Sequence, residues 1–289
     1  MDNHYSKYTN GNRRQNGLKI CHYNQGGALL QNKINFAEAF IERHRPHILG
    51  ISESNFFIQH DINSVQIKDY HFSPSATLSN PQLKVSRVCV YIHHSLVYKV
   101  RNDLMDGTFS SVWIEAGLPH KKKILIANVY REWGYLRQTD PLKSRDLAEQ
   151  LNRWIIFLDQ WERALCEGKE VLVTGDVNID QMNWCKDDVE APSQIRKLRP
   201  LINELFTRIF PYGVSQLVTK PTRFAPHQPA SGLDHLYSNN PEKLSEIEVL
   251  SCGSDHKALS IARYGKSIGR QSRYITKRCL FVCLFVCLC

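Results

Sequence analysis

Polar side chains able to do chemistry stand at the ends of apolar runs in this sequence. The clearest case is the run Val171 to Thr174, which leads into Gly175, Asp176 and Asn178. If the run is a buried strand, its pleat directs Asp176 and Asn178 to one face at the end of the sheet. Gly-Asp-x-Asn also occurs in turns, where Asp and Asn bond their own backbone. The motif alone therefore leaves a catalytic and a turn interpretation open.

Comparable polar residues follow other apolar runs. They are Asn24, Glu53, Tyr130, Asp234, Asp255 and His256. Each alone has an ordinary explanation, because Asn, Asp and His are frequent in loops. Together, carboxylate and amide oxygens at one sheet edge suit Mg²⁺, and a nearby histidine suits general base catalysis. The set predicts one site, provided that the strands bring these ends together.

The elements that must position these residues alternate between strands and helices. Short apolar or alternating runs predict strands at 18–23, 47–52, 88–92, 112–116, 123–130, 171–174, 232–237, 247–251 and 258–262. Helical spacing of apolar residues predicts helices at about 32–45, 141–167 and 193–209. The middle strands follow one another through loops, which favours antiparallel pairing. We expect a four-layer α/β sandwich, with two mainly antiparallel sheets flanked by helices.

Length and composition indicate one globular unit. The 289 residues are 42% hydrophobic and 22% charged, without an internal linker. We expect a disordered polar stretch at 1–17, one domain at 18–262, and a tail at 263–289 that is first basic and then apolar. Four of the nine cysteines lie in the last eleven residues, and the other five are scattered. This spacing argues against a disulfide framework or a structural zinc site and favours a reducing compartment.

The net charge of +9 lies mostly outside the predicted domain. Residues 263–289 contribute +6 and residues 1–17 contribute +2, which leaves +1 for residues 18–262. Composition thus favours a nucleic acid partner only weakly, and a solubilising tail explains it equally well. No secretory signal is visible, and the terminal repeat of Cys, Leu, Phe and Val is short for a bilayer span. We expect an intracellular monomer, nuclear or cytoplasmic, without stable membrane association; a membrane anchor is the alternative for the repeat.

The order of the motifs resembles the endonuclease/exonuclease/phosphatase superfamily. The resemblance rests on Asn24 in Cys-His-Tyr-Asn, Glu53 in Gly-Ile-Ser-Glu-Ser, Tyr130 in Ala-Asn-Val-Tyr-Arg, Gly-Asp-x-Asn at 175–178, Asp234 in Gly-Leu-Asp-His, and Ser-Asp-His at 254–256. Residues 215–223, followed by 231–235, are most similar to the endonuclease domain of non-LTR retrotransposons. The departures are Gln25-Gly-Gly27 after the asparagine, Ser54 after the glutamate and Val177 inside Gly-Asp-x-Asn. None of them removes a reactive group.

This resemblance implies a Mg²⁺-dependent phosphodiesterase that nicks DNA, with Mn²⁺ as an alternative metal. It assigns the metal to three residues: Glu53, Asn24 and Asp255. It assigns water activation and phosphate binding to five residues: Asp176, Asn178, Asp234, His256 and Tyr130. Two hydroxyl residues, Thr222 and Ser231, are expected near the phosphate of the DNA. The resemblance leaves open whether Asp176 or His256 is the general base.

Other interpretations remain open. Within the superfamily, the alternatives are an abasic-site repair endonuclease and a lipid or inositol phosphate phosphatase. Outside it, the alternative is an inactive retroelement remnant or a nucleic acid binding module. The repetitive tail favours decay of the gene, whereas the complete set of reactive residues opposes decay of the site. Because little sequence follows the domain, we expect a chain that nicks DNA without copying it. His22 shares a strand face with Asn24 and is expected to be an ordinary buried histidine.

Overall fold

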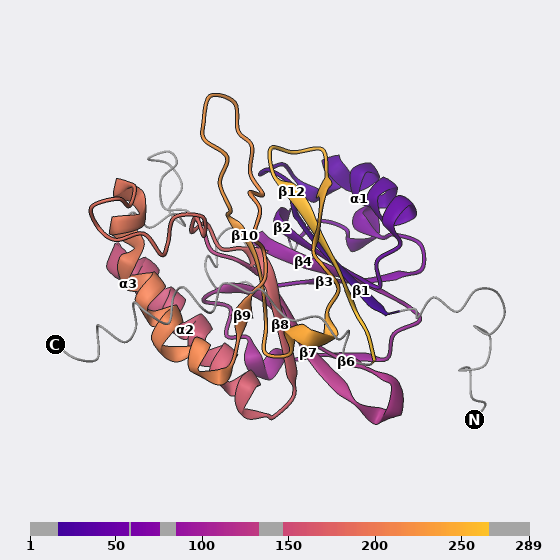
Figure 1. The fold of residues 1–289 in the computed structure, drawn as a ribbon. Helices are drawn as coiled ribbons and strands as arrows, with labels where there is room; N and C mark the ends of the chain where they lie inside the picture. Colours follow the sequence, from indigo (N-terminus) through magenta and orange to yellow (C-terminus); the bar gives the residue numbers. More distant parts are fainter. Residues whose placement is uncertain (1–16, 58, 76–84, 133–146, 266–289) are drawn as a thin grey trace.

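The computed structural model describes residues 17–57, 59–75, 85–132 and 147–265, and this part of the chain forms two sheets and three α-helices (Figure 1). The first sheet has the strand order β11-β12-β1-β2-β4-β3, and the second has the order β5-β6-β7-β8-β10-β9. The first contains β1 (Leu18–Asn24), β2 (Ile48–Phe57), β3 (Tyr70–Pro74), β4 (Val85–His93), β11 (Glu248–Ser251) and β12 (Lys257–Arg263). The second contains β5 (Tyr98–Val100), β6 (Ser110–Gly117), β7 (Lys123–Tyr130), β8 (Glu170–Asp176), β9 (Ser215–Gln216) and β10 (Asp234–Ser238).

The sheets pack face to face, and helices cover their outer faces. Alternate residues of each strand enter different cores, which explains the almost continuous apolar runs in the sequence. In β1, Ile20 contributes to the core between the sheets, whereas Cys21 packs toward helix α1 (Leu30–His44). Helices α2 (Leu147–Cys166) and α3 (Ser193–Arg208) cover the second sheet, with Trp154 and Trp161 buried in the core beneath them. The expected four-layer sandwich is confirmed.

Pairing within the sheets is mainly antiparallel, as expected. The pairs β1-β2 and β7-β8 are parallel, and the other eight named pairs are antiparallel. Each parallel pair lies at the middle of its sheet. Strand ends that carry chemistry therefore meet at one edge of the sandwich.

Strand β2 differs from the sequence prediction. The run 47–52 was expected to end at Glu53, but β2 continues to Phe57 with an irregularity between Ser52 and Phe56. Glu53 and Asn55 have positive φ angles of 54° and 43° there. Such backbone is costly for residues other than glycine and persists only where the surroundings hold it. Glu53 thus projects from a bulge inside a strand, and not from a strand end.

Several predictions concern segments outside the described residues. These are the disorder of residues 1–16, the start of the second helix at 141–146, and the tail from residue 266 with its repeat. Across the described ranges, no helix combines the length and the apolar character needed to cross a bilayer.

Candidate active site

Backbone register gathers the predicted residues from both sheets. Asp234 at the start of β10 pairs with Asp176 at the end of β8, and Tyr130 at the end of β7 pairs with the same aspartate. Asn24 ends β1 in the neighbouring sheet, next to Ser52 of β2. His256 immediately precedes β12. One edge of the sandwich therefore carries side chains from widely separated parts of the sequence.

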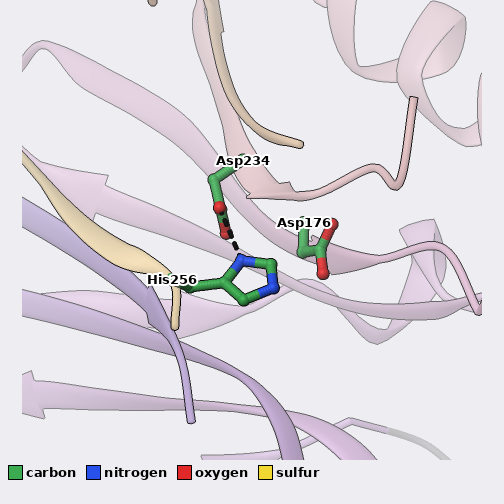
Figure 2. Close-up of side chains that lie close together, drawn as sticks. All are labelled: Asp176, Asp234 and His256. Atoms are coloured by element: carbon green, nitrogen blue, oxygen red, sulfur yellow. Dashed lines mark hydrogen bonds and ion pairs between the residues drawn. The ribbon is translucent and has the colours of Figure 1, made fainter. Parts of the chain in front are cut away.

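His256 and Asp234 form a buried pair (Figure 2). His256 Nδ1 donates to Asp234 Oδ2 over 2.8 Å, and the imidazole lies between Asp234 and Asp176. Thr222 holds the backbone of this aspartate, because its Oγ1 accepts from the N–H of Asp234 at 3.0 Å and of Leu233 at 3.2 Å. The predicted orientation of His256 by Asp234 is therefore present in the geometry.

The side-chain amide of Asn24 links the carboxylates of Asp176 and Glu53. Asn24 Nδ2 donates to Asp176 Oδ2 at 2.7 Å and to Glu53 Oε1 at 3.1 Å. Tyr130 Oη donates to the same Glu53 oxygen at 3.1 Å. Asn24 Oδ1 is engaged differently, because it accepts from the N–H of Gly26. In this arrangement Asn24 offers its amide nitrogen to the carboxylates, whereas a metal ligand would offer its oxygen.

The Gly-Asp-x-Asn segment is both a turn and part of the site. Strand β8 ends at Asp176, and Asp176 Oδ1 accepts from the N–H of Asn178 at 2.9 Å. Asn178 has a φ of 53°, so the pleat of β8 does not extend to it. Its Nδ2 donates to the carbonyl of Arg131, and the buried guanidinium of Arg131 donates to the carbonyls of Val177 and Asn178. The turn interpretation is therefore present in the structure, and the catalytic interpretation stays a prediction for Asp176 and Asn178.

The bulge at Glu53 is held by Gln25. Gln25 Nε2 donates to the carbonyls of Glu53 and Ser54, at 3.1 Å each. Asn55 Nδ2 donates to the carbonyl of Gly27, where a Cβ atom would lie only 3.2 Å from Glu53 Oε2. The unusual sequence Gln25-Gly-Gly27 therefore has a structural role: it shapes the loop that supports Glu53.

Three residues that were predicted to bind the metal or the phosphate bond other parts of the protein in the structure. Asp255 Oδ2 lies 3.0 Å from Arg223 Nε in an ion pair, and no bond joins Asp255 to Glu53 within the described ranges. Thr222 has no exposed surface and bonds backbone, so it is placed to position Asp234. Ser231 pairs with Arg223 through the backbone of the segment between β9 and β10. Substrate contacts by Thr222 and Ser231, and metal binding by Asp255, remain predictions.

The buried side chains of Asp176, Asp234 and His256 differ in their protonation state at neutral pH. Burial raises the pKa of Asp176, and the negative charge of Asp234 raises it further, to about 7. Burial alone would lower the pKa of His256, but the attraction of Asp234 outweighs it and raises the pKa to about 9. Burial also opposes ionisation of Asp234, yet His256 and His22 hold its pKa well below the usual range. At neutral pH, His256 is therefore protonated, Asp234 is ionised and Asp176 is near its midpoint.

Tyr130 keeps its proton throughout this range. Burial, followed by the charges of Glu53 and Asp176, raises its pKa well above the ordinary value. Its hydroxyl is therefore neutral at physiological pH and keeps the hydrogen that it can donate. This state matches the observed donation to Glu53.

The donor set fits a divalent cation. Ligand atoms of Asp176, Asp234 and His256 lie within 4.8 Å of one another, and Asn24 bonds both Glu53 and Asp176. Because His256 is protonated at neutral pH, the carboxylates are the groups that can bind a metal. Carboxylate oxygens are ligands that Mg²⁺ prefers. Because Asp234 already bonds the two histidines, Glu53 and Asp176 are the carboxylates available to a metal.

Sequence reasoning missed four residues that support the site: Gln25, Gly50, Asn128 and Arg131. The contacts of Gln25 and Arg131 are described above. Asn128 of β7 bonds His22, and His22 in turn reaches Asp234. A buried asparagine within an apolar strand was the available signal for Asn128, since a polar group there needs a specific partner.

Known proteins share the sequence pattern and the fold. The sequence model of the Endonuclease/Exonuclease/phosphatase family matches residues 21–256. No match to the chain is found among curated proteins. The endonuclease domain of TRAS1, a telomere-specific non-LTR retrotransposon, is similar in structure with a TM-score of 0.56 and 15% identity, covering 86% of this chain and 100% of that one.

Two further solved structures are similar. The AP endonuclease LMAP from Leishmania major has a TM-score of 0.65 and 14% identity, covering 85% of this chain and 87% of that one. The 3′-5′ exonuclease NExo from Neisseria meningitidis has a TM-score of 0.59 and 13% identity, covering 85% and 99%. At these identities the likeness establishes the fold.

Proposed function

The chain belongs to the Endonuclease/Exonuclease/phosphatase family, and from this premise we propose that it is a Mg²⁺-dependent phosphodiesterase that nicks DNA, derived from a non-LTR retrotransposon. The observation that carries the proposal is the meeting of Asp176, Asp234 and His256 beside Glu53 at one edge of the two sheets. The similar fold of a retrotransposon endonuclease domain supports the choice of substrate.

In this proposal, Asp176 acts on the water and His256 acts on the phosphate. A carboxylate with a pKa of about 7 can orient water and take its proton at neutral pH. A histidine with a pKa of about 9 is already protonated, so it suits charge stabilisation of the phosphoryl group better than proton removal. These pKa values, which belong to the metal-free site, support Asp176 over His256 as general base, the choice that the sequence leaves open.

Other side chains would hold the phosphate and the metal. Asn178 uses its amide nitrogen on the carbonyl of Arg131, and the second hydrogen of that nitrogen is a donor for a phosphoryl oxygen. Tyr130 would bond the same group by its hydroxyl, which now donates to Glu53. Glu53 would be the main ligand of Mg²⁺, with Asn24 and Asp255 as helpers once they change their present partners. The bound ion would neutralise charge on the phosphate and on the leaving 3′ oxygen.

The segment between β9 and β10 supports a nucleic acid substrate. It forms the long orange loop that rises above the labels of β10 and β12 in Figure 1. Phe224 in this segment is 48% exposed, and Lys257 Nζ lies 5.6 Å from the centre of its ring. Arg223, the preceding residue, contacts Asp255 next to His256. An exposed aromatic ring flanked by cations suits stacking on a base and attraction to the phosphate backbone.

A panel of substrates tests the proposal against its rivals. The full chain is incubated in Mg²⁺, in Mn²⁺ and in EDTA with supercoiled plasmid, a duplex with one abasic site, a 3′-phosphorylated duplex and phosphoinositide vesicles. We expect nicking of intact plasmid in either metal, none in EDTA and no release of lipid phosphate. Preferred cleavage at the abasic site would assign a repair endonuclease. Preferred hydrolysis of lipid would contradict a nuclease altogether.

A further inference from the structure

His22 is a buried histidine of β1 that the proposed mechanism does not use. It is 1% exposed, its Nε2 lies 3.2 Å from Asp234 Oδ1, and its Nδ1 lies 2.9 Å from the amide group of Asn128. His22 belongs to the first sheet and Asp234 to the second, so the contact crosses the layer between them. This layer is otherwise apolar around Ile20 and Leu236. A polar group buried there is costly unless each of its atoms is bonded.

The orientation of Asn128 determines which nitrogen of His22 carries the proton. With the amide oxygen accepting from the N–H of Ile51 at 3.0 Å, the amide nitrogen donates to the Thr174 carbonyl at 3.3 Å and to His22 Nδ1 at 2.9 Å. This orientation satisfies both ends of the amide. His22 Nδ1 is then an acceptor, so the ring proton lies on Nε2. His22 therefore donates to Asp234 Oδ1.

Gly50 makes this arrangement sterically feasible. A Cβ atom at residue 50 would lie 2.3 Å from Asn128 Cγ and 2.5 Å from its Oδ1. Only glycine in β2 leaves room for the amide at that depth. A continuous polar path thus runs from the middle of the sandwich to the site, through Asn128, His22, Asp234 and His256.

We infer that His22 is a positioning residue: its Nε2–H holds Oδ1 of Asp234, so that Oδ2 alone faces Nδ1 of His256. Thr222 fixes the backbone of Asp234, but among the described residues only the two histidines bond its carboxylate. Without His22, Oδ1 is buried with no donor, and the carboxylate can rotate away from His256. The inference rests on the proposed function, because the effect on cleavage passes through His256.

Two replacements separate this role from packing. His22→Gln keeps an N–H near the position of Nε2, and His22→Leu fills the space without a donor. The matched control is His47→Leu, because His47 also bonds β1, through the N–H of Lys19. We expect His22→Leu to lower kcat for plasmid nicking about 10- to 100-fold with KM little changed. His22→Gln and His47→Leu should stay within about threefold of the parent chain.

A spectroscopic readout on the parent chain is independent of cleavage. The ¹⁵N NMR spectrum of the parent chain is recorded at pH 8 with labelled histidine, and the His22 resonances are assigned by their absence from the spectrum of His22→Gln. We expect Nδ1 of His22 to carry no proton and Nε2 to carry one. A proton on Nδ1 would overturn the inference, and so would a loss of kcat in His22→Gln as large as in His22→Leu. If His22→Leu does not fold, the glutamine variant and the spectrum decide. A parent chain that fails to cleave DNA but shows the expected spectrum would refute the proposed function alone.

Discussion

At the residue scale, the behaviour of the site depends on Asp176, a buried carboxylate that lies close to protonated His256 and to a second carboxylate, Asp234. Asp176 has no exposed surface, and its partners are the amide of Asn24 and the backbone of Asn178. Its raised pKa means that the folded chain binds a proton more tightly than the unfolded chain does. Ionisation of this group therefore works against folding when no metal is bound.

The sign of this effect can be tested in the metal-free protein. Unfolded Asp titrates near 3.9, whereas Asp176 titrates at about 7 when folded, so its stabilising contribution is full below pH 4 and is lost as pH rises through 7. We expect Asp176→Asn to remove this loss. Between pH 5 and pH 8 in EDTA, the parent should lose roughly 2 kcal/mol more in free energy of unfolding than the variant. Urea unfolding at the two pH values measures it.

An exposed carboxylate provides the control for this prediction. Asp188 has 73% of its side chain exposed, so Asp188→Asn should leave the pH dependence of the parent unchanged. A parent and an Asp176→Asn variant that lose equal stability between the two pH values would show that Asp176 does not hold its proton in the folded state.

The candidate residues were largely predictable from the sequence, but most of their contacts were not. Asp176, Asp234 and His256 meet as expected, because each terminates or begins a strand at the same edge. His22 was expected to be an ordinary buried histidine, and it is buried with both ring nitrogens bonded. That one of its partners is Asp234 depends on a contact across 212 residues, which no local pattern encodes.

At the element scale, the parallel pairs β1-β2 and β7-β8 at the middle of the two sheets carry most of the site residues. Gly175 allows β7 and β8 to lie close to each other. A Cβ atom at residue 175 would lie 2.0 Å from the carbonyl oxygen of Val129 in the neighbouring strand. Gly175 directly precedes Asp176, so any displacement of the backbone here would move the carboxylate that we propose as general base. The glycine of the Gly-Asp-x-Asn motif is therefore a requirement of strand packing.

Replacement of Gly175 tests this requirement. We expect Gly175→Ala to destabilise the chain by about 3 kcal/mol or more, because backbone must move to relieve the clash. Gly168→Ala is the control: Gly168 has a φ of 66° but no atom within 4 Å of a built Cβ, so only the cost of left-handed alanine applies, about 1 kcal/mol. Thermal unfolding followed by circular dichroism measures both. Equal losses in the two variants would contradict the packing argument.

The bulge in β2 could not be predicted from the sequence, because residues of another loop stabilise it. The apolar run to Ser52 indicates a strand, but the positive φ angles of Glu53 and Asn55 are stabilised by Gln25 and Gly27 of another loop. A strand that appears to stop at a polar residue can continue through a bulge when distant partners bond its backbone. The unusual Gln25-Gly-Gly27 sequence gave no sign of this role on its own.

At the scale of the whole molecule, the architecture followed from the sequence because buried strands and amphipathic helices have distinct periods. The strands that were not predicted are β3, β5 and β9, and each lies at an edge of its sheet. An edge strand pairs on one side only and is short, so its residues carry a weak apolar pattern. The strands that carry most of the candidate site residues are central, so their apolar pattern is strong enough to be predicted.

The nuclease account requires both sheets at once, since Asn24 and Glu53 come from one and Asp176 and Asp234 from the other. A nucleic acid binding module or an inactive remnant could keep this fold without any reaction. Binding of DNA therefore does not discriminate between these interpretations, whereas turnover that depends on the shared site does.

The most direct test is single-turnover nicking of supercoiled plasmid in Mg²⁺ by the parent chain, Asp176→Ala and His256→Ala, each first shown to be folded by its thermal transition. We predict that the parent converts the plasmid to the open circular form and that each variant is slower by about 1000-fold or more. Variants that nick at the rate of the parent, or a folded parent that does not nick at all, would contradict the account.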